Sequence, residues 1–208
     1  MYLPKHFLVE DQAILAQLIA EYPLATIVAN LDGHFEINHL PLMLSDDKSK
    51  LYGHIARMNP LAKVASSNNL SVTAIFNGPN AYVTPAWYPS KKESGKVVPT
   101  WNYAVVHAEG SIKLVEEGPW LRGHVSHMTN LHEPTYQSSW ELDDAPEDYV
   151  QTMLKAIVGI EIEVSSLVGK FKLSQNRPAQ DYEAVVVQLE KSPQEALQEM
   201  LQYMRPPQ

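Results

Sequence analysis

The sequence contains no cysteine, which excludes disulfide bonds and thiolate-bound metal sites. Redox chemistry would therefore require a bound cofactor. The sequence also lacks an apolar run near the roughly 20 residues that cross a bilayer. Residues 1–7 lack the basic and apolar segments of a signal peptide. These absences predict a cytoplasmic protein with no membrane partner.

Positive charge is scarce as well. Sixteen Lys and Arg residues stand against 24 Asp and Glu residues, which gives a formal net charge of −8. An acidic surface repels the phosphate backbone that supplies most non-specific affinity for DNA. The densest basic groups, at 91–96 and 170–177, are short and interrupted. Direct DNA binding therefore has only weak support.

The apolar pattern predicts a mainly β chain with flanking helices, an α+β fold class, in one domain over 1–208. Apolar or alternating runs indicate strands, and caps followed by helical spacing indicate helices. Strands are expected over 24–30, 35–44, 51–55, 70–76, 81–83, 101–115 and 157–164. Helices are expected after Asp11, over 61–66, 119–131 and 147–156, and after Ser192. This spacing of short strands is typical of a barrel.

Turn and cap residues set the boundaries between these elements. Residues 31–33 predict a hairpin turn, and Asn-Gly-Pro-Asn at 77–80 predicts a break between two strands. Three prolines predict a loop over 84–100. Asp144 with Glu147, and Ser192 with Glu195, have the spacing of capping boxes.

The first candidate site lies over 51–60, where a strand runs into a turn and a short helix. Arg57 and Asn59, with backbone N–H groups at the helix start, offer donors to a phosphate. Gly53 permits close approach of the backbone. The alternative is that Arg57 pairs with a surface carboxylate and Asn59 only caps the helix.

A second candidate is the strand segment around Asn38 and His39. Polar side chains on a strand need partners when buried, so these residues either face solvent, serve a site or form a satisfied part of the core. Pro41 cannot donate to a sheet ladder and therefore indicates an edge or a bulge. An edge position favours access by a ligand.

Two further segments combine charged, amide and aromatic side chains. Residues 169–177 are basic and rich in amides, which suits a phosphate or a flavin edge, or else form a solvated turn. Residues 99–103, with His107, offer aromatic faces that stack on a planar ring or belong to the core.

Histidines 124, 127 and 132, with Glu133, raise the question of a metal site. His124 and His127 have helical spacing, but no His-Glu-x-x-His pattern accompanies them. We therefore predict no metal and expect a capping or interface role. Nucleophile elbows, phosphate loops and dinucleotide fingerprints do not occur in the sequence.

Five blocks together, at 1–7, 38–42, 53–60, 98–103 and 169–177, closely resemble the PaiB family of FMN-binding negative transcriptional regulators. The resemblance runs nearly end to end. It implies an antiparallel FMN-binding split β-barrel of Greek-key type, with FMN as cofactor. It also implies a homodimer with the flavin at the subunit interface.

By that resemblance, Arg57 is the expected ligand of the FMN phosphate, with His54 and Asn59 nearby. Residues 38–42 would lie along the flavin, and part of the pocket would come from the second subunit. The implied cofactor-binding residues are Asn38, His39, Leu40, Pro41, Gly53, His54, Ala56, Arg57, Asn59, Trp101, Asn102, Tyr103, Lys172 and Gln175. Residues 125–129 depart from a more leucine-rich family pattern.

The function implied is negative transcriptional regulation by a route that the sequence does not identify. No helix-turn-helix is recognisable, which favours action through a metabolite, a protein partner or the redox state of the flavin. The alternatives are a flavin-dependent oxidoreductase acting on a small molecule and a haem-binding split barrel that uses some of the eight histidines.

Overall fold

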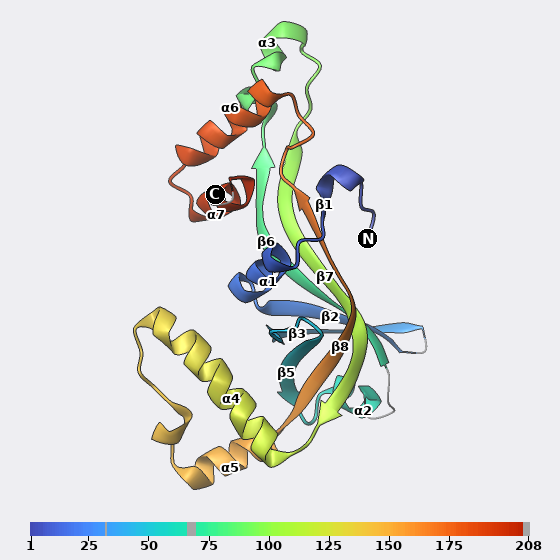
Figure 1. Cartoon of the computed structure of the whole chain (residues 1–208), viewed down its shortest axis with the longest axis vertical. Helices are drawn as coiled ribbons and strands as arrows, with labels where there is room; N and C mark the ends of the chain where they lie inside the picture. The colour runs from blue at the N-terminus through green and yellow to red at the C-terminus, as the bar shows by residue number, and fades with distance from the viewer. Residues whose placement is uncertain (32, 66–69, 206–208) are drawn as a thin grey trace. The chain divides into compact units, whose positions relative to one another are not determined.

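Figure 1 shows the computed structural model of the chain, which describes residues 1–31, 33–65 and 70–205. The strands are β1 (Leu8–Val9), β2 (Leu24–Leu31), β3 (His34–Pro41), β4 (Met43–Leu44), β5 (Lys50–Ala56), β6 (Leu70–Val83), β7 (Thr100–Val115) and β8 (Ile157–Lys172). The α-helices are α1 (Gln12–Glu21), α2 (Pro60–Ala65), α3 (Ser90–Ser94), α4 (Gly118–His132), α5 (Glu147–Lys155), α6 (Ala179–Glu190) and α7 (Glu195–Met204). Short 3-10 helices cover Lys5–Phe7, Pro85–Trp87, Glu133–Tyr136 and Leu142–Asp144. Each described helix is too short or too polar to span a lipid bilayer.

Within the described residues, the strands form one antiparallel sheet of eight strands that does not close on itself. The order is β3-β2-β6-β7-β8-β5-β4, and β1 pairs with β8. The predicted class, mainly β with flanking helices, is confirmed. So are the predicted helix after Asp11, whose carboxylate accepts from Ala13 N at 2.8 Å, and the helix predicted over 119–131.

The segment predicted as one strand over 35–44 is two strands at opposite ends of the sheet path. β3 pairs with β2 from Leu24↔Pro41 to Leu31↔His34, whereas β4 pairs with β5. The chain leaves the β2–β3 ladder at Leu42, whose N–H donates to the carbonyl of Pro23 at 2.9 Å. Leu42 is 1% exposed, so the corner between the two strands is anchored in the core. Asp32, in the predicted hairpin turn, lies outside the described residues, and Gly33 has a φ of 90°.

The break predicted at 77–80 is wrong, because β6 continues from Leu70 to Val83. A proline φ near −65° is compatible with extended backbone, so Pro79 removes a donor without turning the chain. Gly78 allows close packing at the same place. A Cβ there would lie 2.9 Å from the side chain of Leu18 and 3.1 Å from the carbonyl oxygen of Ala104.

The segment predicted as a loop over 84–100 contains a 3-10 helix and α3. The Thr84 hydroxyl accepts from Ala86 N at 3.2 Å, and Gly95, with a φ of 66°, ends α3. Ser90 donates from its backbone N and its hydroxyl to the buried Asp181 carboxylate, at 3.1 and 2.6 Å. Local caps and this buried carboxylate therefore order a proline-rich segment.

Neither predicted capping box forms. Asp144 instead accepts from Glu141 N at 2.9 Å around the preceding 3-10 helix, and α5 follows Pro146 without a side-chain cap. The hydroxyl of Ser192 accepts from Gln194 N at 3.2 Å, and α7 begins at Glu195 without a side-chain cap. Both segments have the residue spacing of a capping box, but the side chains of Asp144 and Ser192 accept hydrogen bonds within the turns that precede α5 and α7.

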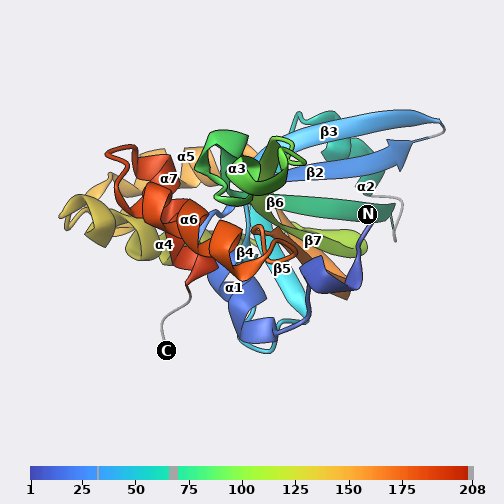
Figure 2. The same cartoon turned by 90° about the horizontal axis from the view of Figure 1, so that it is seen from above.

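The chain divides into two compact units. Unit 1 comprises residues 1–22, 76–107 and 167–208, and unit 2 comprises residues 23–75 and 108–166. In unit 1, α6 and α7 lie side by side (Figure 2) and bury Val185, Leu189 and Met200. The core of unit 2 includes Ile27, Leu51, Ile112, Ile160 and Ile162. One domain over 1–208 stays a prediction.

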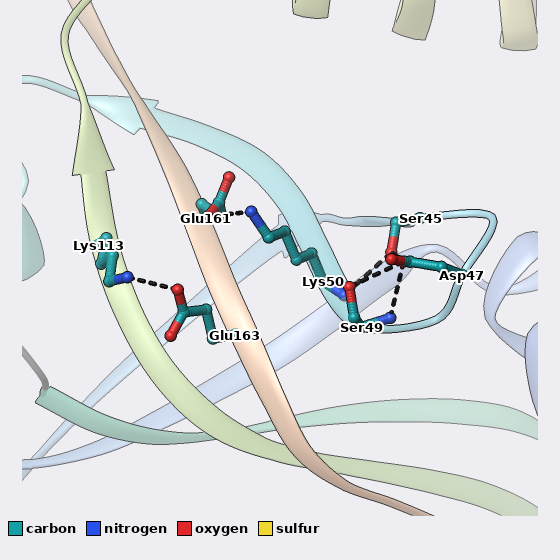
Figure 3. A network of polar contacts seen from close by, with 7 residues as sticks. All are labelled: Ser45, Asp47, Ser49, Lys50, Lys113, Glu161 and Glu163. Carbon is teal, nitrogen blue, oxygen red and sulfur yellow. Dashed lines mark hydrogen bonds and ion pairs between the residues drawn. The ribbon is translucent and has the colours of Figure 1, made fainter.

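Two ion pairs link neighbouring strands of unit 2 (Figure 3). Lys113 on β7 pairs with Glu163 on β8, and Glu161 pairs with Lys50 on β5 at 2.8 Å. The adjacent residues Ile160 and Ile162 are fully buried. The alternation of Glu161 and Glu163 with Ile160 and Ile162 therefore gives β8 one solvent-facing and one buried face over 160–163, whereas Val164 is only half-buried.

Candidate functional site

The predicted cofactor-binding residues fall into two groups, one in each compact unit. Unit 2 holds Asn38, His39, Leu40, Pro41, Gly53, His54, Ala56, Arg57 and Asn59. Unit 1 holds Trp101, Asn102, Tyr103, Lys172 and Gln175. The surroundings of each group decide which side chains have hydrogen-bonding capacity left for a ligand.

Arg57 follows the last residue of β5 and is fixed by backbone carbonyls. Its Nε donates to the carbonyl of Lys155 at 3.2 Å and its Nη2 to that of Ile157 at 3.0 Å. Its Nη1 donates to the Glu116 carboxylate at 3.0 Å, and the two side chains are 41% and 67% exposed. A guanidinium carries more N–H donors than these contacts use. Backbone carbonyls therefore hold the Arg57 guanidinium in place, and its exposed N–H groups can bind another anion.

Asn59 connects two of the predicted segments. Its Oδ1 accepts from Leu61 N at 2.9 Å, which caps α2, and its Nδ2 donates to Asn38 Oδ1 at 2.7 Å. Asn38 in turn donates to Glu36 at 3.0 Å. These bonds hold the turn after β5 against β3. The cap predicted as the structural alternative for Asn59 is present.

The other predicted residues of β3 and β5 differ in exposure. His39 is exposed and its Nδ1 lies 3.0 Å from the hydroxyl of Thr26, so it is not a core histidine. Leu40 is buried, Pro41 is half-buried and Ala56 is exposed at the end of β5. A Cβ on Gly53 would lie 2.7 Å from the Leu42 side chain. Gly53 therefore serves close packing against the corner between β3 and β4.

His54 contacts a histidine that is 70 residues away in the sequence. Its Nδ1 lies 3.2 Å from Nε2 of His124 on α4, so one ring donates and the other accepts. Burial lowers the pKa of both imidazoles, and that of His124 falls to about 4 with repulsion from His54 and His127 added. Both rings are therefore neutral at pH 7. Sequence reasoning singled out each histidine but carried no signal that pairs them.

An aromatic cluster surrounds this pair. Trp120 stacks on His124 with ring centroids 5.0 Å apart and planes 10° apart, and Tyr52 meets Trp120 edge-on at 6.2 Å. Gly159 makes room for the indole, because a Cβ there would lie 2.3 Å from the Trp120 ring. The cluster therefore depends on a glycine of β8 that sequence reasoning did not identify.

A cavity of about 330 Å³ opens beside the cluster, which is within the usual size range of small-molecule pockets. Its lining residues are Met43, Tyr52, Pro119, Trp120, Gly123, His124 and His127. Across the part of the chain that the structure describes, no group of three or more His, Cys, Asp or Glu side chains is arranged to hold a metal ion. His132 lies in the last turn of α4, away from this lining.

In unit 1, Trp101 and Tyr103 line a second cavity, of about 310 Å³. Asn77 and Asn80 contribute amides to it. Trp101 is 54% exposed, and the ammonium of Lys170 lies 5.5 Å from the centroid of the Tyr103 ring. These two predicted aromatic residues therefore share an open surface next to amide groups.

The other predicted residues of unit 1 are engaged in internal hydrogen bonds. Asn102 is fully buried and accepts from the hydroxyl of Ser174 at 2.9 Å. Lys172 donates to Thr100 Oγ1 and to the carbonyl of Trp101, and burial lowers its pKa. Gln175 closes a turn by accepting from Leu173 N at 2.6 Å. None of these three lines the cavity of Trp101 and Tyr103.

Residues 169–177 are only in part the solvated turn that the alternative interpretation described. β8 continues through Lys172, and both Leu173 and Ser174 are buried. The guanidinium of Arg177 lies 5.0 Å from the centroid of the Tyr88 ring. The amides and cations of this segment thus mainly hold unit 1 together.

Comparisons with known proteins give a consistent result. Residues 1–166 match the family model described as "Putative FMN-binding domain". The chain is 31% identical over 206 residues to "Protease synthase and sporulation protein PAI 2" of Bacillus subtilis, covering 98% of this chain and 96% of that protein. It is 33% identical over 223 residues to an uncharacterised protein of Emericella nidulans, covering 89% of each. The solved "FAD and Heme binding protein" from Mycobacterium smegmatis shares the fold, with a TM-score of 0.63 at 14% identity over 86% of this chain and 79% of that chain.

Proposed function

Because this chain belongs to the PaiB family of FMN-binding domains, we propose that Arg57 is the main ligand of the FMN phosphate. The family confirms FMN as the cofactor, and the fold is the split β-barrel that the sequence resemblance implied. Bound FMN supplies one- and two-electron redox chemistry, whereas the residues of the chain bind and orient it.

The contacts of Arg57 carry this proposal. Its bonds to the carbonyls of Lys155 and Ile157 hold the guanidinium in place without cancelling its charge. Its one anionic partner among the described residues, Glu116, is mostly exposed, and an exposed ion pair contributes at most about 1 kcal/mol. A phosphate dianion forms stronger charge-assisted hydrogen bonds and can displace that carboxylate. The site therefore fits a phosphate ester.

Asn59 and Asn38 support Arg57 by fixing the turn that follows β5. Leu40, Pro41 and Gly53 form the packed corner beside that turn. We propose that Trp101 and Tyr103 of the second subunit offer ring faces to the flavin, because they line an open cavity with two amides. Asn102, Lys172 and Gln175 support unit 1 through the internal bonds described above.

We expect Arg57→Ala to weaken FMN binding by about 1.5–3 kcal/mol, the usual loss for a hydrogen bond to a charged group. Riboflavin, which lacks the phosphate, should bind the variant and the unchanged chain equally well. Flavin fluorescence titration measures both affinities. Equal FMN affinities would contradict the phosphate assignment, and an equal loss for riboflavin would point to a folding defect.

Glu116→Gln is the matched control for this variant. It removes the carboxylate that competes with phosphate but leaves both carbonyl contacts of Arg57. FMN binding should tighten or stay unchanged, because an anion no longer has to be displaced. Weaker FMN binding in Glu116→Gln would show that Glu116, rather than Arg57, organises the site.

We further propose that the protein is a cytoplasmic homodimer and a negative transcriptional regulator that does not read DNA directly. The net charge of −8 supports an indirect route, through a metabolite, a partner or flavin redox state. Light scattering should give twice the monomer mass. In an electrophoretic mobility-shift assay, DNA fragments from the promoter of the protein's own gene should show no salt-dependent shift. A sequence-specific shift would overturn the indirect route. Reduction of bound FMN by NADPH would instead favour a flavin-dependent oxidoreductase.

A further inference from the structure

The cavity beside His124 has the chemistry of a second ligand site. Its residues, Met43, Tyr52, Pro119, Trp120, Gly123, His124 and His127, are called the Trp120 cavity below. We propose that the Trp120 cavity binds a neutral, planar nitrogen heteroaromatic molecule that is not FMN. This inference stands on the geometry of unit 2 and does not depend on Arg57.

The composition of the lining selects a neutral ligand. None of the lining residues is Asp, Glu, Lys or Arg. A charged ligand would give up part of its hydration against these walls without meeting an oppositely charged side chain, which is unfavourable. The phosphate of FMN likewise finds no cation in this lining, which separates the Trp120 cavity from the proposed phosphate site.

The aromatic walls select a planar ligand. Trp120, Tyr52 and the imidazole of His124 offer flat faces and edges, and aromatic partners prefer offset or edge-on contact with such surfaces. Met43 adds a polarizable thioether, which packs well against ring edges. An aliphatic ligand of equal size would use these walls less well.

The imidazoles select a heterocycle over a hydrocarbon. The contact between His124 Nε2 and His54 fixes the orientation of the His124 ring. No hydrogen bond of its other ring nitrogen occurs within residues 1–31, 33–65 and 70–205. His127, one turn further along α4, is exposed at the cavity. A ring nitrogen or N–H of a ligand can pair with either imidazole.

Two glycines keep the cavity in this form. Gly159 leaves space for the Trp120 indole, as described above. Gly123 lies inside α4, where glycine costs about 1 kcal/mol relative to alanine, yet a Cβ there would meet nothing within 4 Å. Packing therefore does not explain Gly123. Gly123 does, however, leave the space above the helix open to a ligand.

Benzimidazole is the probe, titrated by calorimetry into the full chain near pH 8, first without FMN and then with saturating FMN. We expect one molecule to bind per chain under both conditions. Benzoate, which is planar but charged, should bind at least about tenfold more weakly, a difference of about 1.4 kcal/mol. Arg57→Ala should leave benzimidazole binding unchanged. The experiment therefore distinguishes a failure of the proposed phosphate site at Arg57 from a failure of the proposed ligand site in the Trp120 cavity.

Gly123→Leu tests the location, because its side chain extends into the cavity while leucine favours the helix. We expect it to weaken benzimidazole binding by about tenfold or more. Asn130→Leu, at an exposed position of α4 outside the lining, is the matched control and should bind normally. Circular dichroism of both variants confirms that α4 remains folded.

Several results would overturn the proposal. They are absence of benzimidazole binding, equal binding of benzoate, and undiminished binding by Gly123→Leu. Loss of the probe when FMN is added would also overturn it, because the cavity would then belong to the flavin site.

Discussion

Replacing Gly110 with alanine is expected to destabilise the protein by about 3 kcal/mol or more, the upper range for an overpacked core position. A Cβ on Gly110 would lie 2.2 Å from the carbonyl oxygen of Glu163 and 2.9 Å from Cγ2 of the fully buried Ile162. Gly110 is on β7 and Glu163 is on the neighbouring strand β8. The nearest obstacle is backbone, so relief requires the two strands to separate. Urea unfolding measures the effect.

Gly123→Ala is the matched control, since it adds the same methyl group where nothing lies within 4 Å. In a helix interior this change should stabilise the protein by about 0.5–1 kcal/mol. The same chemical change thus has opposite signs at the two positions. Similar free energies of unfolding for the two variants would contradict the close approach of β7 and β8.

Acidification is expected to destabilise the protein through His124. Burial, with repulsion from His54 and His127, lowers its pKa from 6.5 to about 4 in the folded chain. Below pH 6.5 the unfolded chain binds a proton that the folded chain does not. The free energy of unfolding therefore falls as the pH drops from about 6.5 to about 4, by on the order of 2–3 kcal/mol. Above pH 6.5 His124 is neutral in both the folded and the unfolded chain, so the free energy of unfolding no longer depends on its protonation.

His124→Gln isolates this contribution from the general effect of acid on carboxylates. Glutamine cannot take up a proton in this range, and its amide can still hydrogen-bond to His54. The variant should therefore lose less stability than the unchanged chain between about pH 7 and about pH 4.5. Urea unfolding at both pH values gives the comparison, and parallel pH profiles would show that His124 is protonated in the folded state.

The sequence predicts most strands because local patterns determine them. The alternation of Glu161 and Glu163 with Ile160 and Ile162 places one face in water, and the structure has that arrangement. Predictions were wrong where distant packing decides. The Asn-Gly-Pro-Asn segment at 77–80 predicts a break, but β6 runs through it, and Gly78 leaves there the space that Leu18 and Ala104 require.

For the candidate site, the sequence identified side chains but not their partners. Arg57, Asn59 and Asn38 were predicted to lie at one site, and Asn59 does bond to Asn38. Pairing of His54 with His124 depends on how α4 packs against β5, and no spacing in the sequence encodes this. The role of Gly159 is likewise visible only once Trp120 occupies its place.

Leu42 connects the two strands that lie at opposite ends of the sheet path. β3 and β4 end the sheet path, yet one residue joins them in the chain. An edge strand can pair with strands of other molecules. The short connection through Leu42 limits how far β3 and β4 can move apart. Because Leu42 is buried, a protease can cleave the connection between β3 and β4 only after local unfolding. Cleavage at this corner would remove the direct chain connection between β3 and β4, which are the two ends of the sheet path.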